Sequence, residues 1–272
     1  MRRASAGTRL ANGRRMKTML CVSTLAFAIS ACGGFEVEPA SSEASIIRGQ
    51  VDREHDAVGQ LGHVSQGALS FVCTATLIGP RTALTAAHCM FDAEGRRVTA
   101  PRLRFALEGE AMADVAASSV ITSFAPARGS WDDLAVLVLE APASTPPIPV
   151  SVAAPRYGEA MVVGYGVTRA TGRQRGTGAG IRRKARIELV RIDPSELEYP
   201  VEPSGACYGD SGGPVLQLQG GREVLVGVTS RGTSTDCLES DIATRADSFV
   251  PWIRAKSRGD GCISACDFDP GD

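Results

Sequence analysis

The sequence predicts an all-β protein, a barrel or a sandwich, with one helix near its C-terminus. Short apolar runs alternate with turn signals, and 30 of the 272 residues are Gly, a pattern typical of antiparallel strands joined by tight turns. The length allows one large domain or two small ones. With 22% charged and 43% hydrophobic residues, the composition excludes a disordered chain, a coiled coil and a collagen-like fibre.

The predicted strands are the apolar runs themselves, each of which ends at or near a turn signal. The first run ends at Gly79-Pro80, where a strand cannot readily continue. One segment, residues 247–256, predicts a helix because Phe249, Trp252 and Ile253 share one helical face. The strand runs cover residues 71–78, 134–139, 160–163, 214–218 and 224–228.

The N-terminus predicts an export signal. Residues 1–31 hold six basic residues and no acidic one, and an apolar run extends from Met19 to Ala31. That run is too short to span a bilayer and has the length of a signal-peptide core. Met16 is an alternative start, because Met16-Lys17 opens a compact signal by itself.

Cys32 marks the expected end of the signal. The sequence Ile29-Ser30-Ala31-Cys32 resembles a bacterial lipobox, which implies cleavage before Cys32 and a diacylglycerol on its thiol. The alternative is an ordinary signal peptide with a Cys near its cleavage site. In both cases we expect export, as a membrane-anchored lipoprotein or as a secreted or periplasmic protein. The lipid would be the only contact with a membrane.

The chain is expected to have four parts. Residues 1–31 are the signal, and residues 32–45 are a flexible linker or propeptide of mostly small residues and Glu. Residues 46–256 form the folded domain, and residues 257–272 form an acidic tail that contains two cysteines. The net charge of the whole chain is −1, so no basic excess indicates a nucleic-acid partner.

Six cysteines lie beyond Cys32, at positions 73, 89, 207, 237, 262 and 266. An even number in an exported chain predicts disulfides. Their spacing is not that of a zinc site, and we expect neither a metal nor another cofactor.

Three short motifs carry the residues of a nucleophilic hydrolase. They are Thr-Ala-Ala-His-Cys at 85–89, Asp-Asp-Leu at 132–134 and Gly-Asp-Ser-Gly-Gly-Pro at 209–214. A serine hydroxyl needs an adjacent base to become a nucleophile, and histidine suits that role because it titrates near neutral pH. A carboxylate then orients the imidazole and stabilises its charged form.

These motifs, in the order His, Asp, Ser, resemble the trypsin/chymotrypsin-like serine peptidases over residues 46–256. The resemblance implies two packed six-stranded antiparallel β-barrels, an active site between them and a C-terminal helix. It also implies a catalytic triad of His88, Asp133 and Ser211, with the backbone N–H groups of Gly209 and Ser211 as the oxyanion hole. Asp132 is the alternative to Asp133, which is preferred because it directly precedes the apolar strand.

The cysteines fit the same resemblance. It implies a Cys73–Cys89 disulfide beside the catalytic histidine and a Cys207–Cys237 disulfide that ties the specificity pocket together. Cys262 and Cys266 match nothing in the family, and a short-loop disulfide between them is predicted, with free thiols or other partners as alternatives.

His55 and His63 lie in no motif. We therefore predict that both are surface residues.

The segment that begins at Ile46 resembles the new N-terminus that members of the family acquire on activation. Cleavage of the Ser45–Ile46 bond would free an ammonium group that pairs with Asp210 and orders the oxyanion loop. The alternative is that residues 46–47 are simply the first strand and that no cut occurs. Because Ser45 is not basic, a trypsin-like enzyme is not expected to cut there, and the cut would need a separate activating protease.

The specificity pocket departs from trypsin. Gly205 stands where trypsin has its pocket-bottom aspartate, while Asp241 falls on the opposite wall, where Gly is usual. An acidic pocket that prefers Lys or Arg and a neutral pocket with Asp241 at the surface are both open. Ser230 and Gly232 match the strand that pairs with the substrate backbone, and Arg231 replaces the usual aromatic residue between them.

The predicted function is an exported serine endopeptidase acting on peptides or proteins. One alternative is a non-catalytic binding protein on the same fold. The other is a zymogen that stays inactive until a partner protease cuts it.

Overall fold

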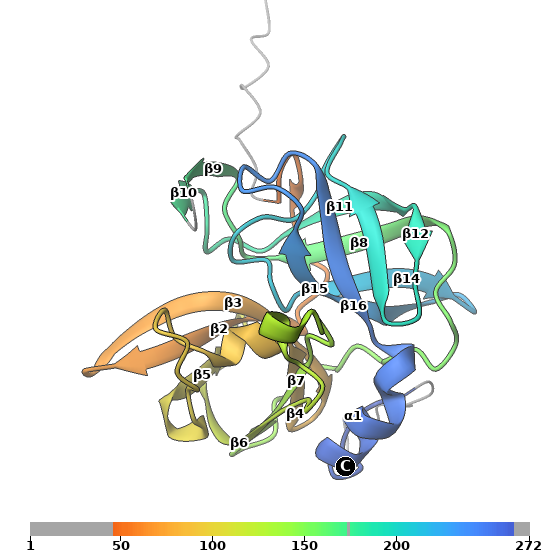
Figure 1. Ribbon diagram of the computed structural model, residues 1–272. Coiled ribbons are helices and arrows are strands. Elements are labelled where there is room, and N and C mark those ends of the chain that lie inside the picture. The colour runs from red at the N-terminus through yellow and green to blue at the C-terminus, as the bar shows by residue number, and fades with distance from the viewer. Residues whose placement is uncertain (1–45, 173–174, 264–272) are drawn as a thin grey trace, which may run out of the picture. The chain divides into compact units, whose positions relative to one another are not determined.

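The first half of the domain is a closed antiparallel barrel of six strands. The structure, a computed structural model, describes residues 46–172 and 175–263. Figure 1 shows the barrel in orange to green. Its strand order is β2-β3-β4-β7-β6-β5. The strands are β2 (Val58–Ser65), β3 (Ala68–Gly79), β4 (Thr82–Thr85), β5 (Leu103–Ala106), β6 (Ala113–Val120) and β7 (Ala135–Leu139).

The second half is an eight-stranded antiparallel sheet, drawn mostly in green to blue in Figure 1. Its order is β1-β11-β8-β14-β15-β16-β13-β12. The sheet curls, so that β11 and β13 contact each other although four strands separate them. The strands are β1 (Gln50–Val51), β8 (Gly158–Gly164), β11 (Arg183–Leu189), β12 (Arg191–Ile192), β13 (Glu196–Pro200), β14 (Pro214–Gln219), β15 (Arg222–Gly232) and β16 (Ser240–Arg245).

The predicted all-β fold with a C-terminal helix is confirmed, and the second half adds a detail to it. Six of its strands form the curled body, and the two-residue strands β1 and β12 extend it at the edges. A separate hairpin, β9 (Arg169–Gly172) and β10 (Arg175–Thr177), stands beside the sheet.

Four short 3-10 helices and one α-helix complete the described elements. The predicted helical segment forms as η4 (Asp247–Phe249) followed by α1 (Val250–Lys256). Its apolar face packs on the core of the first barrel through buried Ile253 and partly buried Phe249 and Trp252. The other 3-10 helices are η1 (Ala87–Met90), η2 (Ala100–Arg102) and η3 (Pro126–Arg128).

Alternating burial explains why these sequences form strands. Along β11 and β13 every second residue is buried, as a sheet with one face on the core requires. One group of buried apolar residues joins the first barrel to β8, β14 and β15, and Ile46 is fully buried in another group that lies within the second half. In the described part of the chain, no helix is long and apolar enough to cross a membrane.

Several predictions fall outside the described residues. They concern the signal at 1–31, the lipid on Cys32, the linker at 32–45 and the end of the tail. Cys262 is buried and disulfide-bonded, whereas its predicted partner Cys266 lies outside the described residues.

Candidate active site

His88 and Asp133 meet because the strands that carry their motifs are neighbours. His88 lies in η1, just after β4, and Asp133 lies two residues before β7, to which β4 pairs. One carboxylate oxygen of Asp133, Oδ2, is 2.7 Å from His88 Nδ1, and the other, Oδ1, accepts the His88 backbone N–H at 2.8 Å. This arrangement places the ring hydrogen on Nδ1 and leaves Nε2 free to act as a base.

The surroundings of Asp133 keep its carboxyl group ionised. The residue is fully buried, and burial alone would raise its pKa. The charge of His88 and hydrogen bonds from His88 and Ser230 outweigh that effect, so the pKa is lowered. The Ser230 hydroxyl donates to Oδ2 at 2.5 Å, and the backbone N–H of Asp133 donates to Thr244 Oγ1 at 3.3 Å.

The neighbouring carboxylate has no comparable setting. Asp132 is partly exposed, and its backbone carbonyl accepts the N–H of Leu134 at 3.0 Å. Of the two aspartates, Asp133 is the one whose carboxylate contacts His88.

Ser211 lies on the loop before β14, against the first barrel. Its backbone carbonyl accepts the Thr74 N–H at 2.9 Å, and the Thr74 hydroxyl donates to the carbonyl of Gly209 at 2.8 Å. The Ser211 hydroxyl donates to the Ser230 carbonyl at 3.4 Å. Among the described residues no hydrogen bond joins it to His88, and catalytic contacts of this kind often tighten only when substrate binds.

The loop around Ser211 contains a glycine in a left-handed backbone conformation. Gly209 has a φ of 99°, and a Cβ there would lie 2.9 Å from the Cα of Gly166. Only glycine adopts this φ without strain and also leaves room for the Cα of Gly166. The loop is closed by hydrogen bonds from the N–H of Asp210 to the carbonyl of Cys207 and from the N–H of Gly213 to the carbonyl of Asp210.

Asp210 is buried behind this loop. Its Oδ1 accepts the N–H of Gly166 at 2.7 Å, and its Oδ2 accepts that of Cys207 at 2.9 Å. Burial raises the pKa of Asp210 to about 7, against the lowering effect of these hydrogen bonds. The predicted partner Ile46 is fully buried, and Ile47 donates its N–H to the carbonyl of Gly205 at 2.9 Å. The hydrogen bonds and ion pairs of the described residues include none between Ile46 and Asp210.

Asp241 is a second buried carboxyl group in this half. It lies on β16, opposite Gly232 on β15 and Tyr199 on β13. Its Oδ2 accepts the N–H of Ala206 at 2.8 Å, and a Cβ on Gly232 would lie 3.4 Å from its Oδ1. Burial, together with the nearby charge of Asp210, raises the pKa of Asp241 to about 8. The reading of Asp241 as a surface residue is therefore wrong.

Gly205 does not leave open space beside it. A Cβ there would lie 2.9 Å from both the Cα and Cγ2 of Val201. Val201, just after the end of β13, thus occupies the space beside Gly205, which the sequence could not reveal.

Arg231 forms a polar flank at the end of β15. Its guanidinium carbon lies 4.6 Å from the centre of the Trp131 ring, and Nη2 lies 2.8 Å from Glu196 Oε1. The cation is thus held by an aromatic face and by an ion pair.

Both disulfides that the family resemblance implies are present. The Cα atoms are 6.2 Å apart in Cys73–Cys89 and 5.5 Å apart in Cys207–Cys237. Cys73, His88 and Cys89 bring potential metal ligands within 4.8 Å of one another. Because the two sulfurs are bonded to each other, neither is a thiolate that can bind a metal.

The prediction that His55 and His63 are surface residues is wrong. His63 is buried, with Nε2 2.8 Å from the carbonyl oxygen of Cys89. His55 is buried between Asp52, whose Oδ1 lies 2.8 Å from Nδ1, and Glu223, whose Oε2 lies 3.1 Å from Nε2. Cys89 is far from His63 in the sequence, and Glu223 is far from His55, so no local pattern marked these histidines as buried.

Asp52, Glu54 and His55 form a second group of potential metal ligands. Arg182 Nε lies 2.9 Å from Asp52 Oδ2, and Lys184 forms an ion pair with Glu54. These cations already neutralise the carboxylates, so the group is explained as an ion-pair network.

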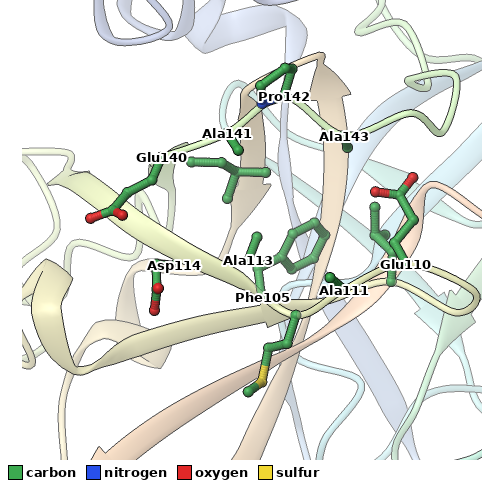
Figure 2. Close-up of a pocket in the computed structure, with 12 residues that line it drawn as sticks. Phe105, Glu110, Ala111, Ala113, Asp114, Glu140, Ala141, Pro142 and Ala143 are labelled. Atoms are coloured by element: carbon green, nitrogen blue, oxygen red, sulfur yellow. The ribbon is translucent and has the colours of Figure 1, made fainter.

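A pocket of about 280 Å³ lies in the first barrel and contains no predicted site residue. In the view of Figure 2, the ring of Phe105 lies between Glu110 and Glu140. Glu110 Oε1 accepts the backbone N–H groups of Ser144 and Thr145 at 3.0 and 2.7 Å. Glu110 therefore holds a loop in place.

The site also uses residues that the motifs did not indicate. Thr74 holds the loop that carries Ser211 by donating its hydroxyl hydrogen to the Gly209 carbonyl, and Thr244 accepts the backbone N–H of Asp133. Ser230 was predicted as a substrate-binding residue, but its hydroxyl also bonds Asp133. No signal in the sequence identified the two threonines, because their contacts cross between the two halves.

The family model described as Trypsin matches residues 46–253. The matched region begins at Ile46 and contains His88, Asp133 and Ser211.

Proposed function

The chain belongs to the trypsin family, and on that premise we propose that it is an exported serine endopeptidase with His88, Asp133 and Ser211 as its triad. Family membership makes it a peptidase that acts on peptides or proteins. The observation that carries the finer assignment is the buried Asp133 carboxylate, which holds His88 through both of its oxygens.

In the proposed reaction the Ser211 hydroxyl attacks the carbonyl carbon of the scissile peptide bond. His88 Nε2 takes the hydroxyl proton, while the Nδ1–H bond to Asp133 stabilises the imidazolium that forms. The backbone N–H groups of Gly209 and Ser211 donate to the oxyanion. His88 then protonates the leaving amine, and a water molecule hydrolyses the acyl-enzyme by the same steps.

The Ser211 hydroxyl must first turn toward His88. Its hydrogen bond to the Ser230 carbonyl is long, at 3.4 Å, and therefore weak. Rotation about the Cα–Cβ bond of Ser211 costs little, and a bound substrate would bring the hydroxyl and His88 Nε2 into hydrogen-bond contact.

Labelling with a fluorophosphonate tests the assignment directly. The reagent should phosphonylate Ser211 alone, which peptide mass spectrometry can locate, and heat-denatured protein should not react. Ser248, an exposed serine whose hydroxyl donates to the Pro194 carbonyl, serves as an internal control. Labelling of Ser248, or of no serine in folded protein, would contradict the proposal.

We also propose that cleavage of the Ser45–Ile46 bond raises activity. Ile46 has a φ of 51°, a left-handed conformation that is strained for a β-branched residue. Cleavage removes the Ser45 carbonyl that makes this conformation costly, and it turns the Ile46 amide into an ammonium that can pair with Asp210. Because Ser45 is not basic, a separate protease makes the cut.

The pocket is proposed to prefer Lys or Arg on the acyl side of the scissile bond. A carboxyl group as buried as Asp241 ionises at neutral pH only if a cation joins it, since burial raises its pKa to about 8. A basic substrate side chain supplies that cation. Since a neutral Asp241 tolerates apolar side chains, the preference is weaker than in an enzyme with a solvated acidic pocket.

Export is proposed through the signal at 1–31, with a lipid on Cys32 and residues 32–45 as the tether. Cleavage before Ile46 would then release the domain from the membrane as it activates it. N-terminal sequencing of membrane-bound and released protein tests this: the released form should begin at Ile46, and a released form that begins at Cys32 would contradict it.

A further inference from the structure

Asp210 and the first residue of β11, Arg183, face the same side of the sheet. Arg183 is the cross-strand partner of Gly164 on β8, and paired residues direct their Cβ atoms to the same face. A Cβ on Gly164 would lie 2.2 Å from Asp210 Oδ1. The Arg183 side chain therefore begins beside the Asp210 carboxylate.

Arg183 is held in this position as a buried cation. The residue is 5% exposed. Its Nη1 donates to the carbonyl oxygens of Gly178 and Ile181 at 3.2 and 3.3 Å. Its charge lowers the pKa of Asp210, and the charge of Asp210 acts on Arg183 in return.

The other ionisable groups near Asp210 do not supply a positive charge. Asp241 on β16 and Tyr199 on β13 both interact with Asp210, and neither is cationic. While the Ser45–Ile46 bond is intact, the Ile46 nitrogen is an uncharged amide. Among the described residues, Arg183 is then the cation that acts on Asp210.

We propose that Arg183 is a positioning residue that favours the ionised form of Asp210 in the intact chain and so helps to form the oxyanion loop before any cleavage. The ionised carboxylate accepts the N–H groups of Gly166 and Cys207, and these bonds fix the loop that carries Gly209. Arg183 thus determines the activity of the uncut form. After the cut, the Ile46 ammonium group raises this activity further. The inference rests on the proposed peptidase function.

The test compares intact and cut forms of the same full chain. An enteropeptidase site before Ile46 allows controlled cleavage, and it is made by Ser41→Asp, Ser42→Asp, Glu43→Asp, Ala44→Asp and Ser45→Lys. The rate of fluorophosphonate labelling at Ser211 is the readout, because the phosphonyl oxygen occupies the oxyanion hole. Arg183→Gln should slow labelling of the intact form at least tenfold and of the cut form less than threefold. Equal slowing of both forms, or none in the intact form, would overturn the proposal.

Three controls separate positioning from general structural damage. Arg183→Lys should restore most of the intact-form rate, and Arg186→Gln, which changes an exposed arginine of the same strand, should leave it unchanged. In an Asp210→Asn background Arg183→Gln should have no further effect, since the coupling requires both charges. A full additional loss there would assign Arg183 a structural role and overturn the proposal.

The pH dependence gives a second readout. Loss of Arg183 raises the pKa of Asp210, so the labelling rate of the intact form should rise with pH at a higher value in Arg183→Gln than in the parent. The cut form should show no such shift, and an unshifted intact profile would contradict the proposal. Ser211→Ala must abolish labelling in every form. If it does not, the peptidase assignment fails, which is a different result from failure of the Arg183 role.

Discussion

Asp133 at the edge of the first barrel and Asp241 in the second half are both buried, yet their pKa values are shifted in opposite directions. The pKa of Asp133 is lowered, whereas that of Asp241 is raised to about 8. Burial acts on both in the same direction. The difference lies in the partners: Asp133 has a histidine and a serine hydroxyl, and Asp241 has one backbone N–H and the like charge of Asp210.

This difference suggests separate roles for the two halves of the domain in reactivity and in selectivity. The first barrel holds a carboxylate whose partners are already in place, so its geometry is ready before substrate arrives. The second half holds a carboxyl group that lacks a cation, so its charge depends on what enters the pocket. Reactivity would then be built into the fold, while selectivity would depend on the ligand.

The largest effect is expected from Ser211, the proposed nucleophile, because both reactivity and selectivity require it. Ser211→Ala should lower kcat by about a million-fold, the loss known from removal of a triad serine. Circular dichroism should show an unchanged fold, because the hydroxyl makes only one long hydrogen bond in the described structure. A wild-type rate of hydrolysis by this variant would contradict the assignment of Ser211 as the nucleophile.

The next largest effect is expected from Asp133, whose carboxylate is already positioned beside His88. Asp133→Asn should lower kcat roughly ten-thousand-fold, because an amide allows the wrong tautomer of His88. Asp132→Asn is the matched control and should change kcat little, since Asp132 does not contact His88. If the two variants exchange these effects, the triad aspartate is Asp132.

The outcome of the sequence predictions follows the same division. Strands and the helix could be predicted because apolar runs and turn signals are local, and the trypsin-like motifs indicated His88, Asp133 and Ser211. The burial of His55 could not be predicted, because it depends on Glu223 from a distant strand. The space beside Gly205 depends on Val201, a contact that no spacing rule supplies.

Asp241, whose carboxyl group has no cationic partner among the described residues, should affect substrate selectivity. Asp241→Gly should lower kcat/KM for Arg substrates by about 10- to 100-fold, the value of a hydrogen bond to a charged group, and should change that for Leu substrates little. In the parent enzyme, the ratio of Arg to Leu kcat/KM should rise as the pH increases through about 8, because Asp241 ionises there. Equal losses for both substrates, or a ratio independent of pH, would mean that the Asp241 carboxyl group does not interact with the substrate side chain.

The pH dependence of stability sharpens the comparison further. A raised carboxyl pKa means that the folded state holds a proton that the unfolded state has released, so Asp241 destabilises the fold increasingly from about pH 4 to pH 8. Asp241→Asn should therefore gain free energy of unfolding relative to the parent as the pH rises across this range. Chemical denaturation at pH 5 and pH 8 measures the difference. An unchanged difference would place the Asp241 pKa near its ordinary value.

The smallest effect concerns Asp52, a buried carboxylate that lies outside the first barrel. Burial would raise its pKa, but hydrogen bonding and charge from His55 lower it to about 2. If partners rather than location decide protonation, His55→Gln should raise the pKa of Asp52 and cost on the order of 1 kcal/mol of stability. Burial also lowers the pKa of His55, but Asp52 and Glu223 outweigh it and the net pKa is raised.

The sign of the pH trend distinguishes this network from ordinary packing. A raised histidine pKa stabilises the fold fully below about pH 6.5 and loses that contribution as the pH rises through the folded-state value, so the cost of His55→Gln should shrink above that value. His63 is the matched control, because burial lowers its pKa. The folded state resists protonation of His63, so the parent loses stability as the pH falls below about 6.5, and the cost of His63→Gln should shrink toward acid pH. Parallel trends in the two variants would mean that loss of packing, and not the charge of the partners, governs both histidines.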